Sequence, residues 1–214
     1  ARKELILFSA NSGGGKSITM SNLGLNLLQT PKDPKVRNVK LNVLYISLEL
    51  SEELIAQRYD TMLTGVSSAV WQVKYKEIAS KVEEISGGVG KLTVKRMPSG
   101  TTSNQIRSYL KEFEMKHGYI PDVLIVDYLD LMGTNQHVAI DNVSIKDKYA
   151  SEQLTDILHD YNMIGITASQ QNRAAVSVDE ADLNQGHIAG GLTKVMAVDW
   201  YVSIVLNDKL KSAG

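Results

Sequence analysis

The amino-acid sequence predicts an α/β domain with a mostly parallel central sheet and helices on both faces. Short apolar runs, typical of buried parallel strands, alternate with longer stretches in which apolar residues recur at helical spacing. A glycine-rich loop joins the first apolar run to the first helical stretch. With 214 residues, the chain is long enough for one sizeable domain, and we expect a single domain over residues 1–214.

Strands are expected where short apolar runs are bounded by turn residues or polar connections. The run that follows Pro121 is the most apolar of the chain, so we expect it to be a central strand. Alternation with helices implies parallel pairing between these strands. The expected strands cover residues 5–8, 42–48, 92–94, 123–126, 163–168 and 200–206.

Helices are expected where apolar residues share one face and capping residues mark the ends. Ser51 can cap a helix that ends before Gly65, and Gly87 and Gly118 stop the two helices that follow. Residues 32–40 and 133–146 are expected to be a solvated connection and a loop, whereas the polar stretch 171–193 is too long for an ordinary connection. The helical patterns lie at residues 18–28, 51–64, 78–85, 106–113 and 150–161.

Composition excludes several classes of function. Cysteine is absent, so the chain has no disulfide framework, thiolate metal site or cysteine nucleophile. The four histidines lack metal-ligand spacing. No apolar run approaches a membrane span, and we expect a cytoplasmic protein without membrane contact. The net charge of −1 argues against a broadly basic nucleic-acid binder, but it allows a local basic stripe or a ring that concentrates charge in a channel.

The loop after the first strand has the spacing of a phosphate-binding loop, G-x-x-x-x-G-K-[ST], with Ala10 in place of the first glycine. Its glycines allow backbone N–H groups to turn inward around phosphate oxygens. Lys16 would reach the β- and γ-phosphates, and Ser17 would hold Mg²⁺. The alternative is a flexible turn with a surface lysine. The residues expected to bind nucleotide are Asn11, Ser12, Gly13, Gly14, Gly15, Lys16, Ser17 and Ile18.

Polar residues at the carboxyl ends of the strands are the other candidates, because ligands of such sheets bind there. Asp127 is placed to hold a metal, although an acid at a strand end can also bond to a neighbouring helix. Glu49 could orient or deprotonate an attacking water, or it could simply favour the next helix start. Gln170 could contact the γ-phosphate or be an ordinary loop amide. Residues 128–131 are expected in the core rather than in a stacking platform.

Three segments in this order resemble the RecA-like motor domain of DnaB-type hexameric replicative helicases. Residues 44–51 contain the counterpart of that family's S-L-E-M segment, residues 124–132 that of I-D-Y-L-x-L-M, and residues 168–173 that of S-Q-x-N-R. The resemblance covers nearly the whole chain. Residues 97–100, Met-Pro-Ser-Gly, are most similar to the replicative helicases of T-even-like bacteriophages.

The resemblance implies a RecA-like P-loop NTPase core that hydrolyses ATP at the subunit interfaces of a hexameric ring and so moves along single-stranded DNA. On that mapping Lys16 and Ser17 hold phosphate and Mg²⁺, Glu49 is the catalytic acid/base, Asp127 is the metal-side carboxylate and Gln170 senses the γ-phosphate. A primase and a helicase loader are the further partners expected. The expected location is the cytoplasm of a bacterium or of a phage-infected host.

The family's DNA-facing loops should fall at residues 133–146 and 171–194, where Arg173 and Lys194 are the candidate DNA contacts. The sequence also departs from the family pattern. No arginine follows Arg173, so the family's arginine finger lacks a counterpart, and we expect a motor-domain fragment without the amino-terminal collar domain. Two alternatives remain open, a RecA-fold recombinase and a module whose ATP state controls assembly without unwinding.

Overall fold

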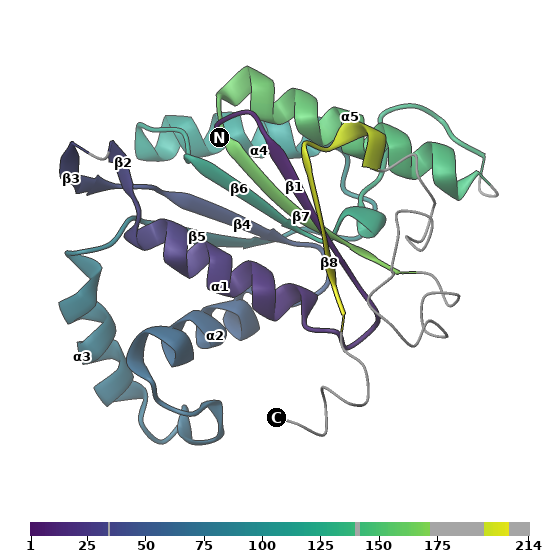
Figure 1. Ribbon diagram of the computed structural model, residues 1–214. Coiled ribbons are helices and arrows are strands. Elements are labelled where there is room, and N and C mark those ends of the chain that lie inside the picture. The colour runs from purple at the N-terminus through teal and green to yellow at the C-terminus, as the bar shows by residue number, and fades with distance from the viewer. Residues whose placement is uncertain (34, 140–141, 172–194, 206–214) are drawn as a thin grey trace.

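A computed structural model describes residues 1–33, 35–139, 142–171 and 195–205 of the chain. Six strands form one sheet in the spatial order β5-β4-β6-β7-β1-β8, and every neighbouring pair is parallel (Figure 1). The predicted parallel sheet is therefore confirmed. The strands are β1 (Leu5–Ala10), β4 (Val43–Ser47), β5 (Leu92–Arg96), β6 (Val123–Asp127), β7 (Ile164–Gln170) and β8 (Trp200–Ile204).

Helices cover both faces of this sheet, as predicted. Figure 1 shows α1 and α2 on one face and α4 and α5 on the other, with α3 beside α2. The Ser51 hydroxyl accepts a 3.3 Å hydrogen bond from the Leu54 N–H and so caps α2, which ends at Gly65 in the left-handed region. The helices are α1 (Lys16–Gln29), α2 (Glu52–Thr64), α3 (Tyr75–Ser86), α4 (Ser103–His117) and α5 (Val143–Tyr161).

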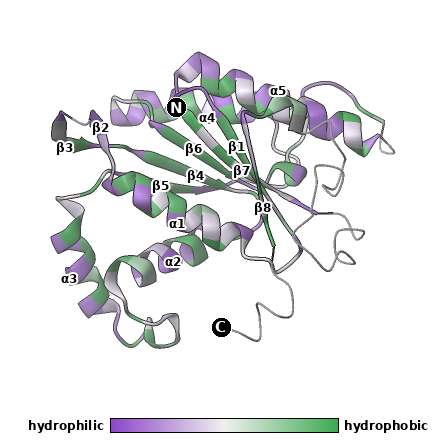
Figure 2. Ribbon diagram, viewed as in Figure 1, coloured by the Kyte–Doolittle hydropathy of each residue, from purple (hydrophilic) through white to green (hydrophobic). Residues whose placement is uncertain are grey.

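The central strands are buried on both faces, and alternate side chains join two apolar clusters. In β4, Leu44 and Ile46 belong to the cluster that includes α4 and α5, whereas Val43 and Tyr45 belong to the cluster that includes α1 and α2. Figure 2 shows the same division, with apolar central strands between helices of mixed character. Burial on both faces explains why these strands read as continuous apolar runs.

Two segments differ from the prediction. Residues 32–40 belong to an antiparallel hairpin, β2 (Pro31–Asp33) and β3 (Val36–Lys40), where the sequence predicted an irregular connection. Lys32 and Asp33 in this hairpin are exposed, so no alternation of apolar and polar residues announces it. Helix α5 begins at Val143, earlier than expected, because Val143 and Ile145 are half exposed and the buried helical pattern starts only at Ala150.

The carboxyl ends of the strands meet along one edge of the sheet. Ser47 at the end of β4 lies opposite Asp127 at the end of β6, and Ala10 at the end of β1 lies opposite Gln170 at the end of β7. The segments that leave these four positions therefore start side by side. In the described ranges, no helix combines the length and apolar character needed to cross a bilayer.

Candidate nucleotide-binding site

The loop between β1 and α1 has the backbone geometry that a phosphate cradle requires. Gly13 and Gly15 have φ angles of +72° and +87°, in the left-handed region that glycine adopts at little cost. A Cβ at Gly14 would lie 2.9 Å from the Asn11 carbonyl oxygen, which accepts a hydrogen bond from the Gly14 N–H. The three glycines are thus required by conformation or by close packing.

Lys16 is the first residue of α1, and its side chain folds back over the loop. Its Nζ lies 3.5 Å from the Ala10 carbonyl oxygen and 3.4 Å from that of Asn11. The Tyr128 ring centroid is 5.7 Å from the same ammonium. The first turn of α1 contains no acidic residue, so the positive end of the helix and the lysine both favour an anion at this position.

A polar pocket of about 230 Å³ lies over the loop and brings together most of the predicted site residues. Lys16, Ser17, Glu49 and Gln170 come from the ends of β1, β4 and β7, and all of them line it. Asn11 and Gly14 shape the loop without being part of this lining. The lining consists of Ser12, Gly13, Gly15, Lys16, Ser17, Ile18, Glu49, Arg58, Tyr128 and Gln170.

Asp127 is fully buried at the end of β6 and is outside the lining of this pocket. Its Oδ2 accepts a 2.7 Å hydrogen bond from the Tyr45 hydroxyl. Its Oδ1 is buried and has no hydrogen-bond partner in the described part of the chain. Asp127 is thus bonded to a strand tyrosine and not to the neighbouring helix of the alternative interpretation, and one carboxylate oxygen remains for another ligand.

Asp130 holds the end of β7, a role that the sequence analysis did not identify. It lies in the short 3₁₀ helix η2 (Leu129–Leu131), which follows β6. Its Oδ1 accepts a 2.8 Å hydrogen bond from the Ser169 hydroxyl, and its Oδ2 accepts one of 2.8 Å from the Gln170 N–H. Asp130 therefore fixes the backbone from which the Gln170 side chain reaches the pocket.

Two further lining residues were missed from the sequence. Tyr128 was expected in the core together with Leu129, which is fully buried, but Tyr128 lines the pocket and packs only partly against the apolar cluster. Arg58 enters from the second turn of α2. The signal for Arg58 was its helical spacing, because no acidic residue stands three or four positions away to pair with it.

The predicted DNA contacts Arg173 and Lys194 lie outside the described residues. Within 133–146, the described range contains one lysine, Lys146, and its Nζ donates a 2.6 Å hydrogen bond to the Asp130 carbonyl oxygen. Lys146 also lies 3.6 Å from the Asp147 carboxylate. This cation is directed toward its own chain in the structure, so the described part of the segment presents no basic lining.

The parallel sheet, the glycine-rich loop before α1 and the polar residues at the strand ends define a P-loop domain with the RecA-like fold. A family model described as the DnaB-like helicase C terminal domain matches residues 1–182. The chain therefore belongs to the DnaB-like helicase C-terminal domain family.

Known proteins agree with this membership. A DnaB-like replicative helicase of Enterobacteria phage T4 is 29% identical over 206 residues, which are 93% of this chain and 41% of that protein. The chain thus spans about two fifths of that relative. Two solved structures share the fold at 15% identity, each over 100% of this chain: an ATPase domain, TM-score 0.80 over 74% of that chain, and a DnaB-like replicative helicase studied with primase, TM-score 0.76 over 49%.

Proposed function

We propose that the chain is the motor domain of a ring-shaped replicative DNA helicase, which hydrolyses ATP between subunits to move along single-stranded DNA. The observation that carries this proposal is the convergence of Lys16, Ser17, Glu49 and Gln170 in one pocket. These residues come from segments far apart in the sequence, and their chemical types are those that phosphoryl transfer requires. Membership of the DnaB-like family supports the coupling of this chemistry to DNA.

The loop holds the triphosphate in this proposal. Backbone N–H groups of residues 13–17 surround the phosphates at the positive end of α1, and Lys16 neutralises negative charge on the β- and γ-phosphates. Asn11, Ser12 and Ile18 complete the loop around the nucleotide. Because hydrolysis transfers the γ-phosphoryl group with little covalent help from the protein, rigid placement by this loop supplies much of the catalysis.

Glu49 is the acid/base of the reaction. It lies past the end of β4 and faces the same pocket as Lys16. The oxygen of a water molecule attacks the γ-phosphorus while the bond to the bridging oxygen of ADP breaks, and Glu49 accepts the proton that the water loses. Gln170 hydrogen-bonds the γ-phosphate and, through its place at the end of β7, transmits the loss of that phosphate to the following segment.

The residues around the loop also fit Mg²⁺. In the described residues, no group of three or more acidic or histidine side chains forms a metal cage. Mg²⁺ is usually held with nucleotide by one or two protein groups, retained waters and the phosphates themselves. Ser17 offers a hydroxyl, and Asp127 offers the buried Oδ1 that lacks a partner among the described residues. Bound there, Mg²⁺ would offset the charge that builds up on the transferring phosphoryl group.

The wider assembly follows from the family. We propose a homo-hexameric ring with single-stranded DNA in its channel, with Arg173 and Lys194 as DNA contacts. One solved relative was studied in its interactions with primase, and we propose a primase and a helicase loader as partners of this protein as well. The phage origin of the T4 relative supports the cytoplasm of an infected bacterium as the place of action.

The test is steady-state ATP hydrolysis by the full-length protein, with and without single-stranded DNA. Lys16→Ala should weaken ATP binding, whereas Glu49→Gln should bind ATP and hydrolyse it about 10²- to 10⁴-fold more slowly. Glu53→Gln is the matched control, because Glu53 lies exposed in the first turn of α2. DNA-stimulated hydrolysis with this pattern, together with strand separation, supports the helicase motor.

Other outcomes point to the alternatives. DNA-stimulated hydrolysis without strand separation would indicate a recombinase of the same fold. ATP binding that changes the oligomeric state without turnover would indicate an assembly module. Normal turnover in the Glu49→Gln variant would remove Glu49 from the mechanism and with it the main chemical support for the proposal.

A further inference from the structure

Arg58 is the second cationic side chain that lines the pocket over the phosphate-binding loop. It projects from α2, whereas Lys16 begins α1, so the two cations enter from different helices. The pocket's lining contains one acidic residue, Glu49. The side chains that face this space therefore carry more positive than negative charge, which favours an anion.

The Arg58 guanidinium is not satisfied by the described part of the protein. Its Nη1 is buried and has no hydrogen-bond acceptor there. A buried charged donor without an acceptor is unfavourable, so such groups are normally paired. The positions three and four residues away on α2 cannot pair with it, because they are Leu54, Ile55, Thr61 and Met62.

The acidic residues of α2 are engaged elsewhere. Glu52 accepts a 2.9 Å hydrogen bond from the Arg96 N–H and lies 3.5 Å from Lys95 Nζ. Glu53 is exposed and interacts with Ser51 at the start of the helix. Asp60 accepts a 3.2 Å hydrogen bond from Trp71 Nε1. The acceptor that Arg58 lacks is thus not supplied by its own helix.

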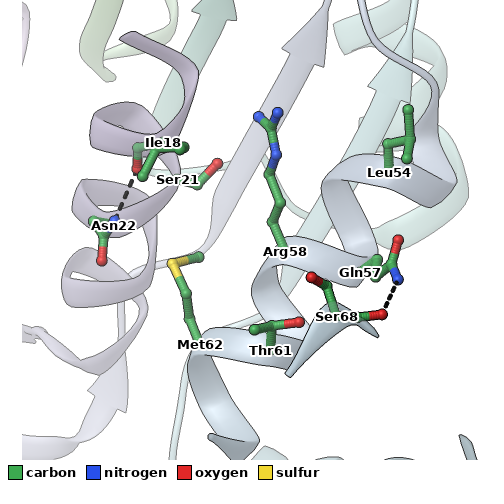
Figure 3. Close-up of a pocket in the computed structure, with 9 residues that line it drawn as sticks. All are labelled: Ile18, Ser21, Asn22, Leu54, Gln57, Arg58, Thr61, Met62 and Ser68. Atoms are coloured by element: carbon green, nitrogen blue, oxygen red, sulfur yellow. Dashed lines mark hydrogen bonds between the residues drawn. The ribbon is translucent and has the colours of Figure 1, made fainter. Parts of the chain in front are cut away.

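An adjoining cavity of about 380 Å³ between α1 and α2 directs the Arg58 side chain. Figure 3 shows its stem extending along the cavity, with the guanidinium between Ile18 and Leu54 and away from Met62 and Thr61. Long cationic side chains commonly bury the aliphatic stem against such apolar walls and present the charge at the far end. Arg58 and Ile18 line both cavities, so the charged end lies where the two meet.

We infer that Arg58 binds the phosphate chain of the nucleotide, as a second cation beside Lys16. The inference rests on the proposed function and adds a residue to it. A guanidinium offers a planar pair of N–H donors that matches two phosphate oxygens, which an ammonium cannot do. Because Arg58 follows Glu49 on the same strand-to-helix unit, a phosphate held by Arg58 also fixes the helix that begins beside Glu49.

The experiment measures binding of Mg-ATP and of Mg-tripolyphosphate to the full-length protein, by competition with a fluorescent ATP analogue. Tripolyphosphate is used because it has the phosphates without the nucleoside. Arg58→Gln should weaken both ligands by a similar factor, about 10- to 100-fold. Arg58→Lys should recover only part of this loss. Arg107→Gln is the control, because Arg107 lies on α4 and pairs with Asp160 instead of lining the pocket.

Thermal unfolding separates a phosphate contact from a structural role. Without nucleotide, Arg58→Gln should unfold at the same temperature as the parent or above it, since the variant removes a buried donor that lacks an acceptor among the described residues. The rise in unfolding temperature on adding Mg-ATP should be smaller in the variant. A lower unfolding temperature without nucleotide, with unchanged ligand affinities, would overturn the inference and make Arg58 structural.

The remaining outcomes are distinct. Weaker ATP binding with unchanged tripolyphosphate binding would overturn the inference, because Arg58 would then contact the nucleoside. Unchanged binding of both ligands by Arg58→Gln, with loss in Lys16→Ala, would overturn the role of Arg58 alone. Absence of ATP binding by the unmodified protein would overturn the proposed function and the inference together.

Discussion

The Tyr45 hydroxyl donates a 2.7 Å hydrogen bond to Asp127 Oδ2 and so joins the middle of β4 to the carboxyl end of β6. Both side chains are fully buried. Burial, reinforced by the nearby Asp127 charge, raises the pKa of Tyr45, so the phenol stays protonated and remains a donor. Tyr45 therefore fixes the orientation of the carboxylate and leaves Oδ1 for another ligand. It acts as a positioning residue for the proposed Mg²⁺ site.

Tyr45→Phe should weaken both the fold and the metal site. The variant leaves Asp127 Oδ2 buried without its donor, which should lower the free energy of unfolding by about 1–3 kcal/mol. The Mg²⁺ concentration for half-maximal ATP hydrolysis should rise by about 10-fold or more, as for other groups that orient a metal-side carboxylate. Urea unfolding and a Mg²⁺ titration measure the two effects.

The control for this change is Tyr109→Phe, which removes a hydroxyl from α4, where the ring packs against Phe113. It should leave the Mg²⁺ dependence of hydrolysis unchanged. A Tyr45→Phe variant that is less stable but needs no more Mg²⁺ would show that the hydrogen bond serves only the fold.

Gly24→Ala should be destabilising although alanine is the better helix former. A Cβ at this position in α1 would lie 2.1 Å from the Tyr59 hydroxyl oxygen and 3.0 Å from Ile125 Cδ1. Helix α1 approaches both α2 and the sheet at Gly24, so the added methyl must push one of them away. Overpacking of this kind should lower the free energy of unfolding by about 1–3 kcal/mol, measured by urea unfolding.

Gly87→Ala is the matched control for this prediction, because its added Cβ would meet nothing within 4 Å and its φ of −68° suits alanine. Gly87→Ala should be neutral or slightly stabilising. Combining Gly24→Ala with Tyr59→Phe should recover part of the lost stability, since the nearest clashing atom is then absent. Equal losses with and without the Tyr59 hydroxyl would assign the effect to Ile125 and the sheet.

Much of the fold was predictable because this sequence signals buried strands and capped helices directly. The apolar run 123–126 was expected to be a central strand, and β6 lies between β4 and β7. The hairpin of β2 and β3 was missed because a strand pair without a buried face needs no alternating pattern. The same reasoning explains the early start of α5, whose first residues are exposed.

The pocket was predictable only in part. Lys16, Ser17, Glu49 and Gln170 follow strand ends, and parallel strands bring such ends to one edge, so their convergence could be expected. Arg58 and Asp130 depend on packing between elements, which sequence spacing does not encode. Asp130 lies past the end of β6, yet η2 turns it back onto β7, and only the tertiary structure shows this.

Asp130→Asn should reduce catalysis by displacing Gln170. The carboxylate receives hydrogen bonds from both the Ser169 hydroxyl and the Gln170 N–H, and an amide can accept through only one of its two terminal atoms. A small displacement of a positioned group should lower kcat by about 10- to 100-fold with little change in KM. Asp156→Asn, in an exposed position on α5, is the control. Unchanged kcat in a destabilised Asp130→Asn variant would exclude the positioning role.

The charge cluster around Asp122 should make stability depend on pH at the acid end. Burial opposes ionisation of Asp122, but the Asn42 N–H, Lys32 and Arg2 outweigh it and lower the pKa of this carboxyl below its ordinary value of 3.8. A lowered native pKa means that the ionised carboxylate contributes stability above pH 3.8, and that this contribution is lost as the pH falls through the lower native value. Asp122→Asn should therefore be less stable at neutral pH, and the difference from the parent should shrink on acidification, whereas Asp160→Asn, with its exposed carboxylate, should show little difference at either pH. Urea unfolding from pH 7 to pH 3 measures this, and a stability difference that stays constant over that range would show that Asp122 acts through packing and not through its charge.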